Sequence, residues 1–100
     1  MLIEESPKPI EFEWDEWNKT KSFLKHGISS DETEEAILNP ERITFEDLTH
    51  SESEKRYVAF GLTRALKLLT ITFTIRKNKI RIISARPSSR KERQIYEKTS

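Results

Sequence analysis

The sequence predicts an α+β fold with two helices ahead of an antiparallel sheet of about four strands, a short N-terminal strand and a short C-terminal helix. Three observations predict it. Apolar residues recur at helical spacing between residues 15 and 40, they alternate with polar residues from 41 to 83, and helical spacing returns after Pro87. Because helices that precede a run of antiparallel strands cover one face of the sheet, we expect both early helices on the same face.

The size and composition of the chain limit it to one domain with a thin core. It has 100 residues, of which 34% are hydrophobic and 35% are charged. We expect residues 1–9 to form an extended lead-in and residues 10–97 to form the domain. The absence of cysteine excludes disulfides, and two histidines alone favour neither a metal site nor a cofactor. With no long apolar run and no signal peptide, we expect a cytoplasmic protein without membrane contact.

Residues 10–26 predict a short strand followed by a helix. Ile10, Phe12 and Trp14 alternate with glutamates, as in a strand with one buried face. Asp15 stands where a helix N-cap is needed, and Gly27 stands where a left-handed C-terminal stop is needed. The expected inner stripe of this helix consists of Trp17, Thr20, Phe23 and Leu24.

A second helix is predicted from Ser29 to the Asn39-Pro40 pair. Ser29 and Glu32 have the spacing of a capping box, which opens a helix. Proline then ends it. Its inward residues are expected to be Thr33, Ala36 and Ile37.

Alternating residues predict the strands 43–46, 57–62, 69–76 and 80–83. Gly61 indicates a bulge or a close backbone approach. The adjacent Ile82 and Ile83 indicate burial on both faces or a bulge, and Lys77-Asn78-Lys79 is a tight turn. The last helix is expected to begin with the capping-box pair Ser89 and Glu92 and to pack through Ile95 and Tyr96.

Charge is divided between the two halves of the chain. Up to Glu54 there are five basic and fifteen acidic residues, whereas from Lys55 onward there are thirteen basic and two acidic ones. The net charges of the halves are therefore −10 and +11. A basic half rich in arginine suits a polyanion such as nucleic acid. The alternative is that the acidic half neutralises the basic half within the fold.

The polar face of the late strands is the first place to look for chemistry. Thr70, Thr72 and Thr74 should share a partly open face with Arg76, and Arg86 should lie close by. Threonine hydroxyls and converging cations suit a phosphodiester groove, although an ordinary solvated strand face has the same composition.

The end of the first helix supplies groups for proton transfer. His26 has the side-chain type that titrates near neutral pH, and Lys25 becomes a base where neighbouring cations lower its pKa. Alternatively, both only complement the helix dipole. His50 lies in a polar turn and is interpreted as structural.

Several chemistries are excluded. The sequence has no glycine-rich phosphate loop, no GxSxG and no HExxH motif. Metal-free transesterification of RNA remains possible, because lysine, histidine and arginine can supply a base, an acid and cations for the phosphorane.

The order and spacing of many residues resemble the BrnT toxin family of bacterial type II toxin-antitoxin systems. The resemblance runs from about Phe12 to Glu97. It is carried by residues 12–15, by Lys25-His26-Gly27-Ile28-Ser29, by Pro40, Asp47, residues 50–52, Glu54, Arg56, Gly61, Thr74 and Arg76, by residues 80–86, and by Glu92-Arg93 and Tyr96-Glu97. The chain departs from the common pattern at Ser22, Ser30 and Pro87.

The resemblance implies a fold like that of the RelE and ParE toxins and an endoribonuclease. Together with the metal-free chemistry that the residues leave possible, it leads us to expect a metal-independent enzyme. It also implies a co-encoded BrnA-like antitoxin that inhibits the toxin, with DNA contacted only through that antitoxin. Carried over by position, the catalytic candidates are Lys25, His26, Arg56, Arg76 and Arg86. The further candidates for RNA binding are Lys79, Arg81, Arg90 and Arg93.

We expect the catalytic candidates to meet around one hollow. Arg76 and Arg86 would be the phosphate and transition-state cations, and His26 or Lys25 would transfer the proton. Arg56 would contact phosphate or form an ion pair with Glu52 or Glu54. Two competing functions are a noncatalytic nucleic-acid module and a subunit whose basic half only receives an acidic partner.

Overall fold

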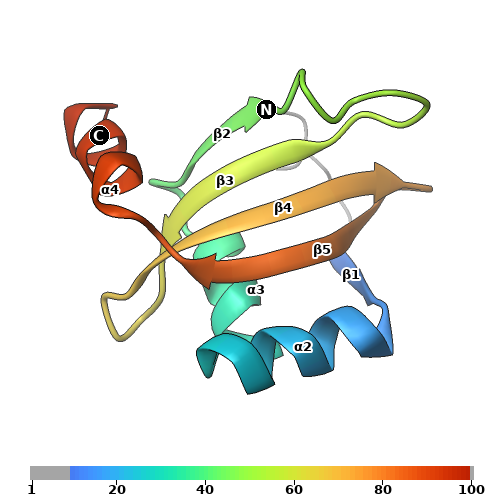
Figure 1. Ribbon diagram of the computed structural model, residues 1–100, viewed down its shortest axis with the longest axis horizontal. Helices are drawn as coiled ribbons and strands as arrows, with labels where there is room; N and C mark the ends of the chain where they lie inside the picture. Colours follow the sequence, from blue (N-terminus) through green and yellow to red (C-terminus); the bar gives the residue numbers. More distant parts are fainter. Residues whose placement is uncertain (1–9, 100) are drawn as a thin grey trace.

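A computed structural model describes residues 10–99 as three helices and five strands (Figure 1). The predicted lead-in, residues 1–9, lies outside the described residues. In chain order the elements are β1 (Glu11–Trp14), α2 (Glu16–His26), α3 (Ser30–Leu38), β2 (Ile43–Glu46), β3 (Tyr57–Leu62), β4 (Leu68–Arg76), β5 (Lys79–Pro87) and α4 (Arg90–Thr99).

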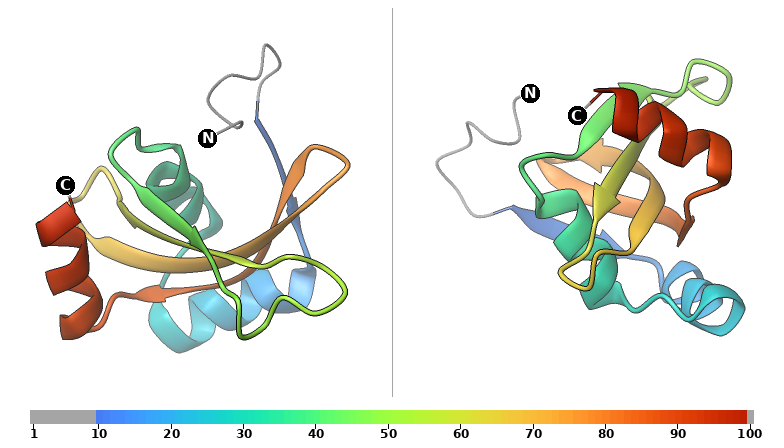
Figure 2. Two further views of the ribbon diagram at one scale, coloured as in Figure 1. Left: turned by 90° about the horizontal axis from the view of Figure 1, so that it is seen from above. Right: turned by 90° about the vertical axis from the view of Figure 1, so that its left-hand side faces the viewer.

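The five strands form one sheet in the order β1-β5-β4-β3-β2. Strand β1 is parallel to β5, and the other neighbours are antiparallel. The sheet is curved, and α4 stands at the opposite end from the turn that joins β4 to β5 (Figures 1 and 2). The predicted α+β fold, with a short N-terminal strand, two early helices and a C-terminal helix, is confirmed.

Helix α2 has the predicted ends but not the predicted inner face. The Trp17 amide donates to Asp15 Oδ1 at 2.8 Å, and Gly27 ends the helix with a φ of 68°. The expected inner stripe is wrong, because Trp17, Phe23 and Leu24 are 71%, 58% and 77% exposed. Of the α2 residues only Ser22 is buried. A small side chain at the contact lets α2 rest against the sheet while its large apolar side chains point outward.

Helix α3 follows its prediction closely. The Glu32 amide donates to Ser29 Oγ, and the Ser29 amide donates to Glu32 Oε1, both at 3.1 Å, so the capping box is formed. Thr33, Ala36 and Ile37 are buried, and the helix ends before Pro40.

Gly61 is the point where α3 and the sheet come closest. A Cβ placed on Gly61 would lie 2.2 Å from the carbonyl oxygen of Ala36. Of the two interpretations of Gly61, the close backbone approach is therefore the correct one. The contact fixes α3 against β3.

The main core lies between the sheet and the early helices. It contains Ile28, Ala36, Ile37, Ala59, Leu69, Ile71, Phe73, Ile80, Ile82 and Ala85. A smaller cluster of Phe60, Leu68 and Tyr96 lies on the other face under α4, with Val58 and Leu62 packed against it. Of the two expected packing residues of α4, Tyr96 is buried and Ile95 is 42% exposed.

The open polar face expected on β4 is largely closed. Thr70 and Thr74 are buried, contrary to prediction. Thr70 Oγ1 donates to Glu92 Oε1 at 3.0 Å and lies 2.8 Å from Ser88 Oγ, so the first turn of α4 covers this end of the strand. Of the two interpretations of the adjacent isoleucines in β5, the bulge is correct, because Thr72 pairs with Ser84 and Phe73 with Ile82, which leaves Ile83 as the extra residue.

Within residues 10–99, no helix is both long and apolar enough to cross a membrane.

The contact between Gly61 and Ala36 predicts the cost of adding a methyl group. We expect Gly61→Ala to lower the free energy of unfolding by about 3 kcal/mol, because a backbone oxygen cannot rotate away from the new Cβ. Gly27→Ala is the control: its Cβ meets open space, and only the positive φ opposes it, at about 1 kcal/mol. Urea denaturation measures both. An equal or smaller loss at Gly61 would contradict the close approach.

Candidate active site

A pocket forms where β5 extends past the end of β1. Strand β1 has four residues and pairs only with the first four residues of β5, up to Ile82. Beyond that point the edge of β5 has no strand beside it among the described residues, and the last turns of α2 border it instead. The pocket between them is about 160 Å³ and is lined by Lys21, Ser22, Lys25, His26, Ile83, Ser84, Ala85 and Arg86.

Lys25 and His26 bring two proton-transfer groups to this pocket. They occupy the last turn of α2, and both side chains are exposed. Neither side chain forms a hydrogen bond or ion pair with another residue in the described range 10–99. Both residues also stand at the negative end of the helix dipole, so their place in the last turn suits the electrostatic role considered from the sequence as well as a role in the pocket.

Arg86 is the third candidate side chain of the pocket, and α4 holds it in place. Its Nη1 and Nη2 donate to Glu92 Oε1 and Oε2 at 2.7 and 2.8 Å. Glu92 also accepts from the Ser89 amide at 2.7 Å, as the predicted capping box requires. The paired Arg86 guanidinium lowers the pKa of Glu92 to about 2, and Glu92 raises the pKa of Arg86. Glu92 therefore fixes the orientation of a permanently charged guanidinium.

Arg76 and Arg56 lie in a second group. Arg76 Nε and Nη2 donate to Glu54 Oε2 and Oε1 at 2.6 and 3.1 Å. This pairing raises the pKa of Arg76 and lowers that of Glu54. Arg56 lines a hollow of about 260 Å³ together with His50, Glu52, Ser53 and Glu54. Arg76, rather than Arg56, is thus the ion-pair partner of Glu54.

The two groups lie at opposite ends of the β4–β5 hairpin. Arg86 pairs with Thr70, whereas Arg76 lies six residues further along β4, which is about 20 Å at the usual rise of a strand. The expectation that all five catalytic candidates meet in one hollow is therefore wrong. Lys25, His26 and Arg86 come together, and Arg56 and Arg76 lie elsewhere. Sequence periodicity predicts which helix or strand carries each side chain. It does not predict which ends of the β4–β5 hairpin these elements bring together.

The additional RNA-binding candidates differ in whether an acidic side chain pairs with them. Arg81 Nη1 donates to Glu13 Oε1 at 2.5 Å, and its Nη2 lies 3.8 Å from Asp15, so the acidic half partly neutralises it. Lys79 pairs in register with Arg76 at the hairpin turn. Arg90 and Arg93 are exposed on α4. The acidic half thus neutralises part of the basic half, as the alternative interpretation of the charge division expects, and binding of a polyanion by the remaining cations stays a prediction.

A carboxylate–imidazole pair was missed by the sequence analysis. His50 Nδ1 lies 2.8 Å from Asp47 Oδ2, and this bond lowers the pKa of Asp47. An aspartate that holds one ring nitrogen orients the other. The three-residue spacing of Asp47 and His50 is the sequence signal for this pair.

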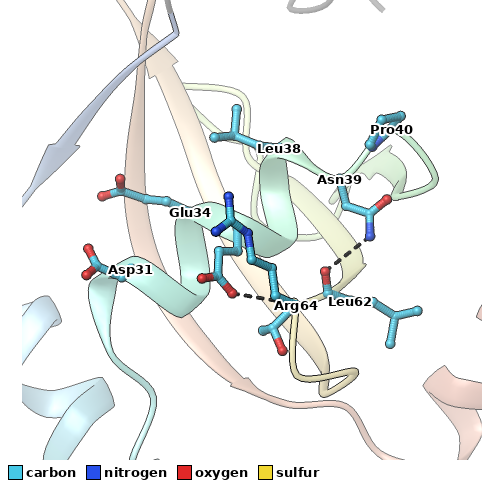
Figure 3. Close-up of a pocket in the computed structure, with 9 residues that line it drawn as sticks. Asp31, Glu34, Leu38, Asn39, Pro40, Leu62 and Arg64 are labelled. Atoms are coloured by element: carbon cyan, nitrogen blue, oxygen red, sulfur yellow. Dashed lines mark hydrogen bonds between the residues drawn. The ribbon is translucent and has the colours of Figure 1, made fainter.

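A larger hollow, between α3 and the end of β3, does not suit RNA. It is lined by Asp31, Glu34, Glu35, Leu38, Asn39, Pro40, Leu62, Thr63 and Arg64 (Figure 3). Its three carboxylates repel phosphate, and only one arginine opposes them. Among residues 10–99, no three His, Asp or Glu side chains are grouped so that they could hold a metal ion.

Fold and pocket together define a class of protein: a small α+β domain with a cationic pocket at a sheet edge, suited to a polyanion such as RNA. Residues 14–92 match the family described as ribonuclease toxin, BrnT, of type II toxin-antitoxin systems. The chain belongs to this BrnT ribonuclease toxin family, as its sequence resemblance implied. A cognate antitoxin and an RNA substrate are the partners of such toxins.

A solved structure supports the same fold. The crystal structure of the Brucella abortus ribonuclease toxin, BrnT, superposes with a TM-score of 0.61 at 21% sequence identity. The match covers 82% of this chain and 100% of that one. No curated protein matches the sequence significantly.

The Arg86–Glu92 pair predicts a pH-dependent contribution to stability. The pKa of Glu92 is lowered by folding, so its contribution is present above its unfolded pKa of 4.5 and is lost as the pH falls through about 2. We expect Glu92→Gln to be less stable by about 1 to 2 kcal/mol at pH 7, after allowing for solvent screening of the half-exposed Arg86.

Urea denaturation followed by circular dichroism between pH 2 and 7 measures this difference. It should shrink below pH 4.5 and vanish near pH 2. Glu97→Gln removes the same charge from the same helix and serves as the control. A Glu92→Gln deficit that persists unchanged at pH 2 would refute the electrostatic origin.

Proposed function

We propose that this protein is a metal-independent endoribonuclease whose active site is the pocket between the last turns of α2 and the edge of β5. One observation carries the proposal: Lys25, His26 and Arg86, which come from two distant parts of the sequence, line the same pocket. These side-chain types supply the three requirements of RNA transesterification, which are a base, an acid and a cation.

The proposed reaction uses the ribose 2′-hydroxyl as its nucleophile. His26 or Lys25 removes the proton of the 2′-hydroxyl while its oxygen attacks phosphorus. The bond from phosphorus to the 5′ oxygen breaks, and the departing oxygen takes up a proton from the other group or from water. The products are a 2′,3′-cyclic phosphate and a 5′-hydroxyl. Arg86, oriented by Glu92, stabilises the extra negative charge of the phosphorane.

The role proposed for Arg76 is not that of the transition-state cation that the sequence predicts. The Arg76 backbone lies about 20 Å along the strand from the position opposite Arg86, and Glu54 holds its guanidinium at that end of the hairpin, so we place it on a different phosphate. In the proposed function, Arg76 and Arg56 bind phosphates of the RNA backbone that are distant from the cleaved bond. Lys79 and Arg81 contribute to the same binding surface. Arg90 and Arg93 extend this basic surface from α4.

The proposed regulation is inhibition by a co-encoded BrnA-like antitoxin. An acidic antitoxin surface would be steered to the cations that bind RNA and would block them. Contact with DNA would then occur only through the antitoxin.

Cleavage in the presence of a chelator tests the proposed chemistry. We expect the purified protein to cut RNA in EDTA, and Arg86→Ala and His26→Ala to lower kcat at least about 100-fold, as loss of a transition-state cation or an acid–base group does. Arg64→Ala, which removes an arginine from the acidic hollow, is the matched control and should cut normally.

Cleavage that disappears in EDTA and returns with a divalent ion would refute metal independence. RNA binding without any fragments would favour the noncatalytic module instead. Circular dichroism of each variant checks that the fold is intact.

The ionic-strength dependence of RNA binding tests the role of Arg76. Each phosphate contact releases counterions, so affinity should fall steeply with salt. We expect Arg76→Ala to lower the slope of log K against log salt by about 1, with kcat nearly unchanged. Filter binding at several salt concentrations measures the slope. A slope unchanged from that of the native protein would exclude Arg76 from the RNA surface.

A further inference from the structure

Helix α2 carries its large apolar side chains on the side that faces away from the sheet. Trp17 and Leu24 are 71% and 77% exposed, and Phe23 is 58% exposed. On the opposite side of the helix, buried Ser22 makes the contact with the rest of the molecule. Exposing three large apolar groups on one eleven-residue helix is costly in water, which indicates a surface that a partner covers.

The exposed apolar groups form one continuous surface, here called the outer α2 face and defined as Trp17, Thr20, Phe23 and Leu24. At 3.6 residues per turn, Trp17 and Leu24 lie one above the other two turns apart, with Thr20 between them. A shallow groove follows one flank of this face and is lined by Glu16, Lys19, Thr20, Phe23, Leu24, Ser29 and Ser30. No other described element lies beyond α2 on this side (Figures 1 and 2).

Cations border the outer α2 face on its other flank. Lys21 follows Trp17 by one turn, and Lys25 follows Lys21 by one more. Both lysines are exposed, and both line the candidate active site. The outer α2 face is therefore continuous with the mouth of the catalytic pocket, so a molecule that covers it also reaches the lysines at that mouth.

We propose that the outer α2 face is the docking surface for an amphipathic, acidic segment of the antitoxin. The apolar stripe of that segment covers Trp17 and Leu24, and its carboxylates pair with Lys21 and Lys25. Charge complementarity favours this occupant over a second copy of the chain, because two copies would bring the lysine rows of α2 together. The inference rests on the proposed function, since it explains how the antitoxin closes the proposed active site.

The test uses the full-length chain and the product of the neighbouring antitoxin reading frame. Trp17→Gln combined with Leu24→Gln should weaken antitoxin binding about 100-fold or more, as expected for removal of two anchor residues. Because both side chains point into solvent, the variant should fold normally and cut RNA at the native rate. The RNA should then be cut even in the presence of an antitoxin concentration that inhibits the native protein.

Leu66→Asn is the matched control. Leu66 is 75% exposed in the turn before β4, away from α2, and asparagine accepts its positive φ of 63°. This variant should bind antitoxin and be inhibited like the native protein. In a Trp14→Phe background Trp17 is the sole tryptophan, and its fluorescence should shift to the blue when antitoxin binds.

Antitoxin affinity is measured by calorimetry in an Arg86→Ala background, so the docking result does not depend on cleavage. Unchanged affinity of the Trp17→Gln, Leu24→Gln variant overturns the proposal, and so does a failure of the native surface to bind antitoxin. Self-association that the double variant abolishes while antitoxin binding persists assigns the face to a second copy and also overturns it. If the native protein cuts no RNA, the proposed function fails, and the binding measurement still decides the docking surface.

Discussion

The difference in length between two neighbouring strands shapes the candidate site. Strand β1 ends at Trp14, which pairs with Ile82 of β5, and β5 continues for five residues beyond Ile82. A longer β1 would pair with these five residues and occupy the place of the pocket. Because β1 turns into α2 at Asp15, the helix runs beside the uncovered part of β5 and brings Lys25 and His26 to the level of Arg86. The bulge at Ile83 occurs where this pairing ends.

The acidic half of the chain neutralises selected cations and leaves others free. Glu13 pairs with Arg81, Glu54 with Arg76, and Glu32 with Lys67. In contrast, Lys25 and His26 have no acidic partner among the described residues. Glu92, the carboxylate that binds Arg86 within the described part of the chain, comes from the basic half and orients Arg86 by two hydrogen bonds. The charge division therefore leaves open cations at the pocket and paired cations along the hairpin.

Helix α2 shows how a periodic pattern can mislead. Its apolar residues have helical spacing, and the same pattern in α3 correctly marks a buried face. Periodicity shows that apolar side chains share a side of the helix, but it does not show whether the protein itself or a partner covers that side. Trp17 and Leu24 are exposed next to the lysines of the pocket, and this position is the basis of the proposed docking surface.

By itself, the sequence determined the elements that local chemistry controls. Asp15 and the Ser29–Glu32 pair begin helices, Gly27 and Pro40 mark where they end, and alternation marks the strands, because these signals act within a few residues. It also indicated the family, through residues whose order matches BrnT. The tertiary structure decided which candidates meet. It joined Lys25 and His26 to Arg86, separated Arg76 from them, paired His50 with Asp47 and turned Trp17 outward, because these outcomes depend on strand length, register and long-range packing.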